Sequence, residues 1–157
     1  MKQEEILSLL SGLLYRSSVN FDPPSRQDWE KLEKKFNIRF HNTYKELILL
    51  LCMYYGLNIL NVSSGKTNGN DTVLATYEFE MALGDWPIYM IPIRSIGNGD
   101  YECLNSYEPF DPRVYYVYHD NRSVEVAADS VELWIKQLAK TLSSGSVNRS
   151  GEDEVNI

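Results

Sequence analysis

Apolar residues recur at helical spacing from the start of the chain. Between residues 3 and 15, Ile6 and five leucines return every three or four positions, and Glu4 and Glu5 precede them. Carboxylates in a first turn are favourable because they face the positive end of the helix dipole. The pattern predicts a first helix, which the Pro-Pro pair at 23–24 separates from the next element because proline removes a backbone donor.

Two further helices are predicted in the first part of the chain. One, over about 26–36, follows Ser25 and Asp28, whose spacing is that of a capping box with an acidic partner. The other is predicted from an apolar stripe over 44–52, which Gly56 can terminate.

From residue 72 the apolar period approaches two. We predict strands in five segments that combine β-branched and aromatic residues with flanking turn formers, namely TVLATYEFEMAL (72–83), WPIYMIPI (86–93), YECLN (101–105), RVYYVYHD (113–120) and SVEVAAD (123–129). Because short strands follow one another directly, most neighbours are expected to be antiparallel.

The last apolar stripe of the chain predicts a helix again. Asp129 or Ser130 is predicted to cap it, with Glu132 answering Asp129. Helices, then strands, then a helix predict an α+β fold in a single domain over residues 1–142. Residues 143–157 lack apolar mass and are predicted to be a disordered acidic tail.

The formal net charge of −7 is concentrated in one part of the chain. Residues 1–60 carry eight Lys or Arg and seven Asp or Glu, whereas residues 61–157 carry seven and fifteen, a balance of −8. An acidic surface repels phosphate backbones and attracts basic proteins. We therefore expect no direct nucleic-acid binding, and we weigh a basic partner against the simpler role of keeping the protein in solution.

The N-terminus and the cysteines indicate the compartment. Glu4 and Glu5 stand where a signal peptide carries basic residues, and no run approaches the roughly 18 apolar residues that a transmembrane helix needs. Cys52 and Cys103 lie 51 residues apart, a spacing typical of neither a disulfide framework nor a paired metal site. We expect a cytoplasmic protein with free thiols and no membrane segment.

Two glycine-containing loops partly resemble known phosphate-, dinucleotide- or calcium-binding loops. Residues 65–67, Gly-Lys-Thr, imitate the end of a phosphate-binding loop, but Leu60 stands where that loop needs glycine. Residues 97–100, Gly-Asn-Gly-Asp, lack the third glycine and the following helix of a dinucleotide site, and they offer few oxygens for calcium. We interpret both as turns, and we expect no cofactor and no metal.

A Cys–His hydrolase is the enzymatic alternative. Cys103 would be the nucleophile and His119 the base, with Asp120 or Asp129 orienting the imidazole. Cys103, however, lies in a strand-like segment and not at a helix N-terminus, where a thiolate is stabilised. A small apolar residue in a sheet is the simpler interpretation, and we expect a protein without catalytic activity.

Several short motifs follow one another in a characteristic order. They are Ser25 with Asp28, Tyr44-Lys45 with Leu47, Ile91-Pro92-Ile93 leading to Gly99-Asp100, and Ala128-Asp129-Ser130. Over about residues 22–140 this order resembles the SUKH superfamily, which contains immunity proteins and fungal cell-wall-assembly regulators. The chain departs from the superfamily's usual proline, glycine, aspartate and aromatic residue at His41, Arg94, Asn105 and Val131.

The resemblance implies a non-catalytic α+β binding domain. Many bacterial members are immunity proteins that bind and neutralise a toxin, often a nuclease, and an acidic, tyrosine-rich face suits a basic toxin domain. We predict that the partner contacts come from aromatic and acidic residues of the second half: Asp85, Trp86, Asp100, Tyr101, Glu102, Tyr107, Glu108 and Asp111. The alternative is a regulatory scaffold like the fungal relatives.

Overall fold

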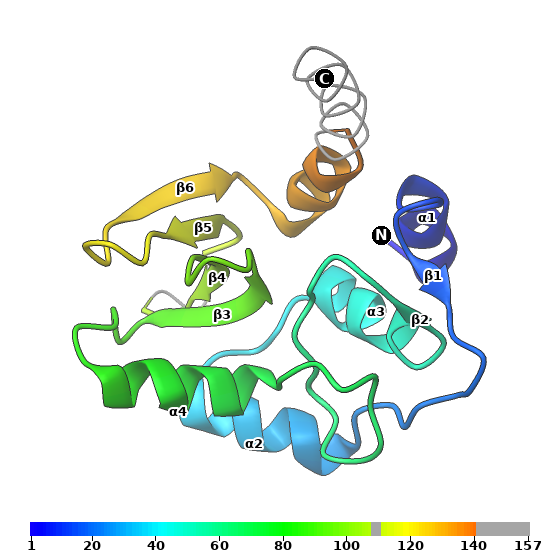
Figure 1. Ribbon diagram of the computed structural model, residues 1–157, viewed down its shortest axis with the longest axis horizontal. Coiled ribbons are helices and arrows are strands. Elements are labelled where there is room, and N and C mark those ends of the chain that lie inside the picture. Colours follow the sequence, from blue (N-terminus) through cyan, green and yellow to red (C-terminus); the bar gives the residue numbers. More distant parts are fainter. Residues whose placement is uncertain (108–110, 141–157) are drawn as a thin grey trace, which may run out of the picture.

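Helices fill the first half of the fold and a sheet fills the second half (Figure 1). The computed structural model describes residues 1–107 and 111–140. The helices are α1 (Gln3–Leu9), α2 (Arg26–Phe36), α3 (Asn42–Leu50), α4 (Val73–Leu83) and a C-terminal helix over residues 131–140. The strands are β1 (Tyr15–Arg16), β2 (Tyr54–Tyr55), β3 (Met90–Ser95), β4 (Tyr101–Asn105), β5 (Val114–Val117) and β6 (Val124–Ala128). This arrangement confirms the predicted α+β class, whereas the predicted tail lies outside the described residues.

Four strands form the larger sheet, in the order β3-β4-β5-β6, and every neighbouring pair is antiparallel. The prediction of strand 101–105 and of antiparallel neighbours is confirmed. The register between β3 and β4 shifts between Pro92 and Arg94. Proline cannot donate to the ladder, so an irregularity beside it is the expected accommodation.

Helix α2 begins and ends where its sequence signals stand. The Ser25 hydroxyl accepts a hydrogen bond from the Asp28 N–H at 3.0 Å, and the Asp28 carboxylate accepts one from the Ser25 N–H at 2.8 Å. The helix ends at Asn37, which has a φ of 53°. The left-handed conformation that asparagine tolerates thus stops the helix, and the predicted bounds of 26–36 are confirmed.

The first helix is shorter than predicted, and the third begins and ends two residues earlier than the predicted stripe. Helix α1 ends at Leu9, before Gly12 turns the chain into β1, and α3 ends at Leu50. A two-stranded ladder that the sequence did not predict, β1 with β2, follows them. Gly56 makes this ladder possible, because a Cβ at its position would lie 2.8 Å from the Leu13 carbonyl oxygen.

Residues 73–83 form helix α4, and the predicted strand over 72–83 is wrong. The Thr72 hydroxyl accepts a hydrogen bond from the Ala75 N–H at 3.1 Å and caps the helix, which Gly84 ends. The buried positions of α4 are spaced by three or four residues, namely Val73, Thr76, Tyr77 and Glu80. Aromatic content favoured a strand, but the cap and the helical spacing of the buried side chains prevailed.

Replacing Thr72 with alanine is expected to lower the free energy of unfolding by about 1 kcal/mol, because an N-terminal donor of α4 loses its acceptor. Urea denaturation measures the change. Ser18→Ala, at an exposed loop position, is the matched control and is expected to change stability by less than about 0.5 kcal/mol. Equal effects of the two substitutions would contradict the cap.

Ser130 caps the C-terminal helix, since its hydroxyl accepts the Leu133 N–H at 3.0 Å. The predicted reciprocal bond from Glu132 to Asp129 is wrong. The Glu132 carboxylate instead accepts the Thr43 hydroxyl at 2.6 Å, because the N-terminus of α3 lies against this helix. A contact across 89 positions of the sequence therefore replaces a local one.

The core lies between the helices and the sheet. Helices α2 and α4 run side by side below β3, and α3 and the C-terminal helix stand at one end of the sheet (Figure 1). Phe36 of α2 meets Tyr77 of α4 edge to face, with 4.8 Å between ring centroids. The largest fully buried side chains come from α1 and its C-terminal end, α3, the segment before α4, α4, β3 and the C-terminal helix: Trp134, Tyr44, Ile6, Leu10, Leu47, Ile48, Leu50, Ile59, Ile91, Ile93, Ile135 and Val73.

Candidate functional site

The predicted partner residues divide into an internal and an exposed group. Trp86, Asp100 and Glu102 are buried, and the side chain of Asp111 is 1% exposed. Tyr101 is half-buried. Two further members are exposed, Asp85 and Tyr107, and Glu108 lies outside the described residues. Burial therefore gives most of the predicted residues internal partners, which we describe first.

Asp100 is the hub of the turn that joins β3 to β4. Its carboxylate accepts the Tyr116 hydroxyl at 2.6 Å and the His119 N–H at 2.7 Å, and it lies 2.6 Å from the His119 Nδ1. Gly99 permits this approach, because a Cβ there would lie 3.0 Å from the His119 Cβ. The loop over 97–100 is a turn, as predicted, and its carboxylate is directed at the β5–β6 turn.

The ionisation of this cluster follows from its contacts. Burial raises the pKa of Asp100, but hydrogen bonds from Tyr116 and His119 outweigh burial and bring it down to about 2. Burial and the bond to Asp100 raise the pKa of Tyr116. The hydrogen bond to Asp100 raises the pKa of His119, whose Nε2 also lies 2.8 Å from the Asp120 carboxylate. The turn between β5 and β6 is thus held by charge as well as by backbone.

Glu102 is paired inside the protein with Arg94, at 2.6 Å. The Arg94 Nε also donates to the Leu57 carbonyl at 2.7 Å, and both side chains of the pair are less than a seventh exposed. Arg94 stands where the resemblance leads one to expect glycine. Its side chain therefore links β3 to the segment before α4, a role that glycine cannot perform.

Trp86 and Tyr101 cover a buried ion pair that the sequence did not predict. Glu80 of α4 is 4% exposed, lies 2.8 Å from the Arg122 guanidinium and accepts the Tyr101 hydroxyl at 3.3 Å. Arg122 also lies 5.3 Å from the centre of the Trp86 ring, which meets the Tyr101 ring edge to face. Burial and Glu80 raise the pKa of Tyr101 to about 12.

The sequence did not predict the ion pair between Glu80 and Arg122, because the residue types over 72–83 favoured a strand. On a helix, Glu80 shares the buried face of Val73 and Tyr77, and a carboxylate on that face requires a cation nearby. The helical spacing was the signal that could have found it. The identity of the cation, Arg122, follows only from the packing of the β5–β6 turn on α4.

Neighbouring side chains hydrogen-bond and ion-pair with the Asp111 carboxylate. Its carboxylate accepts the Tyr115 hydroxyl at 2.5 Å and the Asn105 amide at 3.1 Å, and it pairs with the Arg113 guanidinium at 3.0 Å. Burial opposes its ionisation, but these donors hold its pKa well below the usual value. Asn105 stands where the superfamily often has aspartate. Its amide can donate a hydrogen bond to the Asp111 carboxylate, which an aspartate carboxylate could not do.

Exposed aromatic and apolar side chains gather beside the start of β3. The rings of Tyr89 and Tyr107 meet at 4.7 Å, and they are 48% and 63% exposed. Ile88 is 56% exposed, and its carbonyl is held by the Tyr77 hydroxyl of α4 at 2.8 Å. We call Ile88, Tyr89 and Tyr107 the tyrosine ridge. Large apolar side chains that remain exposed in this way are typical of protein-binding surfaces.

Two arginines of the sheet region are mostly buried, since the side chains of Arg94 and Arg122 are 13% and 16% exposed, whereas that of Arg113 is 44% exposed. Arg94, Arg113 and Arg122 each pair with a buried carboxylate. Other carboxylates of the same region and its flanks are exposed, namely those of Asp85, Asp120, Glu125 and Asp129. The acidity that the sequence locates in the second half is thus displayed by residues other than most of those predicted.

A groove of about 840 Å³ opens between residues 37–43, the end of β4 and the start of the C-terminal helix. Phe40, Leu104 and Val131 are its buried apolar residues. Its carboxylates already have partners: Glu33 accepts the Phe40 N–H, Asp111 binds Arg113, and Glu132 accepts the Thr43 hydroxyl. The groove is therefore a concavity whose acidic groups help to hold the fold.

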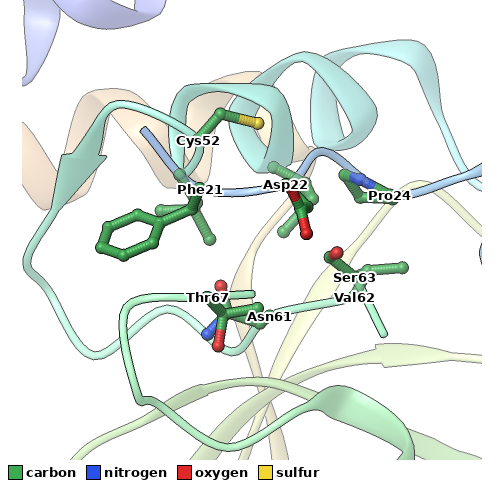
Figure 2. A pocket seen from close by; sticks show the side chains of 10 residues that line it. Phe21, Asp22, Pro24, Cys52, Asn61, Val62, Ser63 and Thr67 are labelled. Atoms are coloured by element: carbon green, nitrogen blue, oxygen red, sulfur yellow. The ribbon is translucent and has the colours of Figure 1, made fainter. Parts of the chain in front are cut away.

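The Gly-Lys-Thr segment at 65–67 surrounds a carboxylate of the chain itself. Figure 2 shows Asp22 pointing toward the segment that carries Ser63 and Thr67, across a cavity of about 10 Å³. The Asp22 Oδ2 accepts the Lys66 N–H at 2.9 Å, and a Cβ at Gly65 would lie 2.5 Å from that oxygen. A cavity of this size admits about one water molecule. The backbone donor that resembled a phosphate ligand is thus satisfied by aspartate.

Cys103 lacks the surroundings of a nucleophile. It is fully buried in β4, and burial together with Glu102 raises the pKa of its thiol well above the usual value. The His119 ring contacts Asp100 and Asp120 instead. Among the described residues, no group of three or more His, Cys, Asp or Glu side chains is arranged to hold a metal ion. No helix in residues 1–107 or 111–140 is long and apolar enough to cross a membrane.

Comparisons with known proteins agree with the fold and with the motif order. A crystal structure of a protein from Pseudomonas syringae pv. tomato is similar, with a TM-score of 0.62 and 22% sequence identity over 86% of this chain and 96% of that chain. At this identity the likeness establishes a shared fold. No protein with curated annotation matches the chain. A family model described as SMI1-KNR4 cell-wall (SUKH_5) matches residues 3–140, and the chain therefore belongs to this SUKH family.

Proposed function

We propose that the protein is a cytoplasmic immunity protein, which acts by binding a basic toxin domain and not by catalysis. The observation that supports the proposal is the sheet region, where three arginines pair with buried carboxylates and four other carboxylates are exposed. Such a surface attracts a basic protein at long range and orients its approach. Membership of a SUKH family supports a protein-binding role.

The tyrosine ridge supplies the contact area that charge alone lacks. Tyrosine buries a large surface at low cost in conformational entropy, and it keeps a hydroxyl for hydrogen bonds. Asp85 lies three residues before Ile88, so an exposed carboxylate accompanies the ridge. We propose that Asp85 and Tyr107 contact the toxin directly, while Trp86, Asp100, Tyr101, Glu102 and Asp111 hold the surface in shape from behind.

Rescue from toxicity tests this proposal. The protein encoded directly upstream of this gene is expressed in bacteria with and without the chain, and we expect it to stop growth alone and to permit growth when the chain is present. The catalytic residues of the toxin are left intact, so that growth reports neutralisation. If the neighbouring protein is toxic and the chain does not restore growth, the proposed function is wrong.

Charge reversal at three exposed positions is expected to slow association with the toxin about tenfold at low salt, because steering is lost. The variant carries Asp85→Lys, Asp120→Lys and Glu125→Lys, and stopped-flow fluorescence measures the rate at several salt concentrations. Glu30→Lys, at an exposed position of α2, is the control and is expected to leave the rate within about twofold. Equal rates for wild type and the triple variant would remove this surface from the interaction.

A regulatory scaffold is the second candidate, favoured by the description of the family model as SMI1-KNR4 cell-wall. A scaffold would organise other proteins through the same exposed ridge without neutralising a toxin. The two candidates differ in the growth experiment, because a scaffold gives no rescue and its loss alters the cell wall instead.

A further inference from the structure

Strand β6 forms an open edge of the larger sheet. It pairs with β5, and within residues 1–107 and 111–140 no other strand pairs with it. Figure 1 shows it on the outside of the sheet, with β5 on its inner side. The opposite edge is closed, because the Leu60 N–H donates to the Ile93 carbonyl at 3.0 Å and the Ser95 N–H to the Asn58 carbonyl at 3.1 Å. In the part of the chain that the structure describes, β6 is therefore the edge of this sheet that offers backbone groups to another chain.

The alternation of hydrogen-bonded and non-bonded residue pairs between β5 and β6 shows which backbone groups of β6 point outward. The Tyr118 N–H donates to the Ser123 carbonyl at 3.0 Å, which makes these two residues a hydrogen-bonded pair. Bonded and non-bonded pairs alternate along an antiparallel ladder, so Glu125, opposite Tyr116, is bonded inward. Val124 and Val126 then direct their N–H and carbonyl groups outward, away from β5.

The side chains of the same residues are also available. Val124 is 40% exposed and Val126 is 46% exposed, and both lie on the face opposite Glu125. Natural sheets usually protect an edge with lysine, proline, a β-bulge or a covering segment, and the register shift between β5 and β6 lies beyond Val126, between the Tyr115–Val126 and Val114–Ala128 pairs. Here the edge presents apolar side chains beside outward donors and acceptors, the combination that strand addition uses.

We propose that β6 receives an extended, basic segment of the partner protein as a fifth strand of the sheet. The charge around β6 favours a basic segment. Three exposed carboxylates lie near it: Asp120 in the turn before the strand, Glu125 within it and Asp129 directly after it. A second copy of the chain would bring two such acidic edges together, whereas an alternating basic and apolar segment would match both the charge and the valines. The inference rests on the proposed function, since it adds β6 to the tyrosine ridge as a second surface that contacts the toxin.

A synthetic peptide tests the edge without knowledge of the toxin. The probe alternates lysine and valine over seven residues, and amide hydrogen exchange of the 15N-labelled protein is followed by NMR. At a peptide concentration about ten times Kd, exchange at the Val124 and Val126 amides is expected to slow about tenfold. Two control peptides, one with proline at the centre and one with glutamate in place of lysine, are expected to give no protection.

Val126→Pro removes an outward donor while sparing the ladder with β5, because proline is tolerated where its nitrogen faces solvent. The variant is expected to keep its thermal transition and to bind the lysine–valine peptide at least about tenfold more weakly. Val126→Thr keeps the donor and the strand preference, and it is expected to bind within about threefold of wild type. If Val126→Pro proves unfolded, the exchange pattern of the wild type with its three peptides still decides.

Three outcomes overturn the proposal. The first is slowed amide exchange confined to parts of the protein other than β6, and the second is a glutamate peptide that slows exchange as much as the lysine–valine peptide does. The third is a wild-type dimer in sedimentation that Val126→Pro dissociates, because a second copy of the chain would then occupy the edge. Failure of the growth experiment with intact peptide binding would refute the immunity function alone. Rescue by a folded Val126→Pro variant as efficient as that by wild type would refute the edge alone.

Discussion

Replacing Arg122 with methionine is expected to lower the free energy of unfolding by about 3 to 5 kcal/mol. The substitution leaves Glu80, which is 4% exposed, without the guanidinium that lies 2.8 Å from its carboxylate. Methionine keeps a long side chain over the Trp86 ring, so the loss reports the charge more than the packing. Urea denaturation followed by tryptophan fluorescence measures the effect.

Two further variants separate the buried charge from other causes. Arg26→Met breaks an ion pair with Glu30 whose side chains are 89% and 59% exposed, and it is expected to cost less than about 1 kcal/mol. Adding Glu80→Gln to Arg122→Met removes the unpaired charge and is expected to restore more than half of the lost stability. A double variant no more stable than Arg122→Met would show that Glu80 is not the source of the penalty.

Asp100→Ala is expected to lower the free energy of unfolding by about 2 kcal/mol near pH 5, because Tyr116 and His119 lose a charged acceptor. The pKa of Asp100 is depressed to about 2 in the folded protein, so its contribution is present above the unfolded value of 3.8 and is lost as pH falls toward 2. The pKa of His119 is raised by Asp100, so that contribution is full below 6.5 and is lost as pH rises through the folded value.

The difference in stability between wild type and Asp100→Ala is therefore expected to be largest between about pH 4 and 6.5. Chemical denaturation at a series of pH values measures it. Asp120→Ala is the control, because Asp120 contacts the same imidazole but its side chain is 85% exposed, and we expect a change of less than about 1 kcal/mol. A pH-independent difference for Asp100→Ala would contradict the assigned ionisation.

Both predictions concern the turn between β5 and β6, and through it the proposed function. Arg122 anchors this turn to α4, and His119 anchors it to the β3–β4 turn. This β5–β6 turn then holds Asp120 and the first residues of β6 in place. The internal carboxylates thus contribute to binding by fixing the position of the exposed ones.

Local signals in the sequence predicted much of the fold. Ser25 with Asp28 located the start of α2, and the alternating segment at 101–105 is β4. Such elements are predictable because their caps and periods act within a few residues. Helix α4 was missed because its aromatic and β-branched residues favour strands, while its tertiary burial favours the helix. The β1–β2 ladder was missed because strands of two residues carry no period.

The predicted site shows the same division. The sequence identified the acidic second half, and of the exposed residues it identified Asp85 and Tyr107 but not Ile88 or Tyr89. It could not show that Asp100, Glu102 and Asp111 face inward, since Asp100 and Asp111 lie in the connections between strands and the central residues of β4 are buried on both faces. Contacts made only in the folded chain decide this question: Arg94 binds Glu102, Arg113 binds Asp111, and Tyr116 and His119 bind Asp100.

The sequence by itself determined the α+β class, the motif order of the family and the negative charge of the second half. These properties depend on composition, local capping and residue spacing, which are present in any chain of this sequence. Only the tertiary structure decided which carboxylates are neutralised, that Glu80 and Arg122 form a buried pair, and that β6 is an open edge. Those properties depend on contacts between residues far apart in the sequence, and such contacts exist only once the chain has folded.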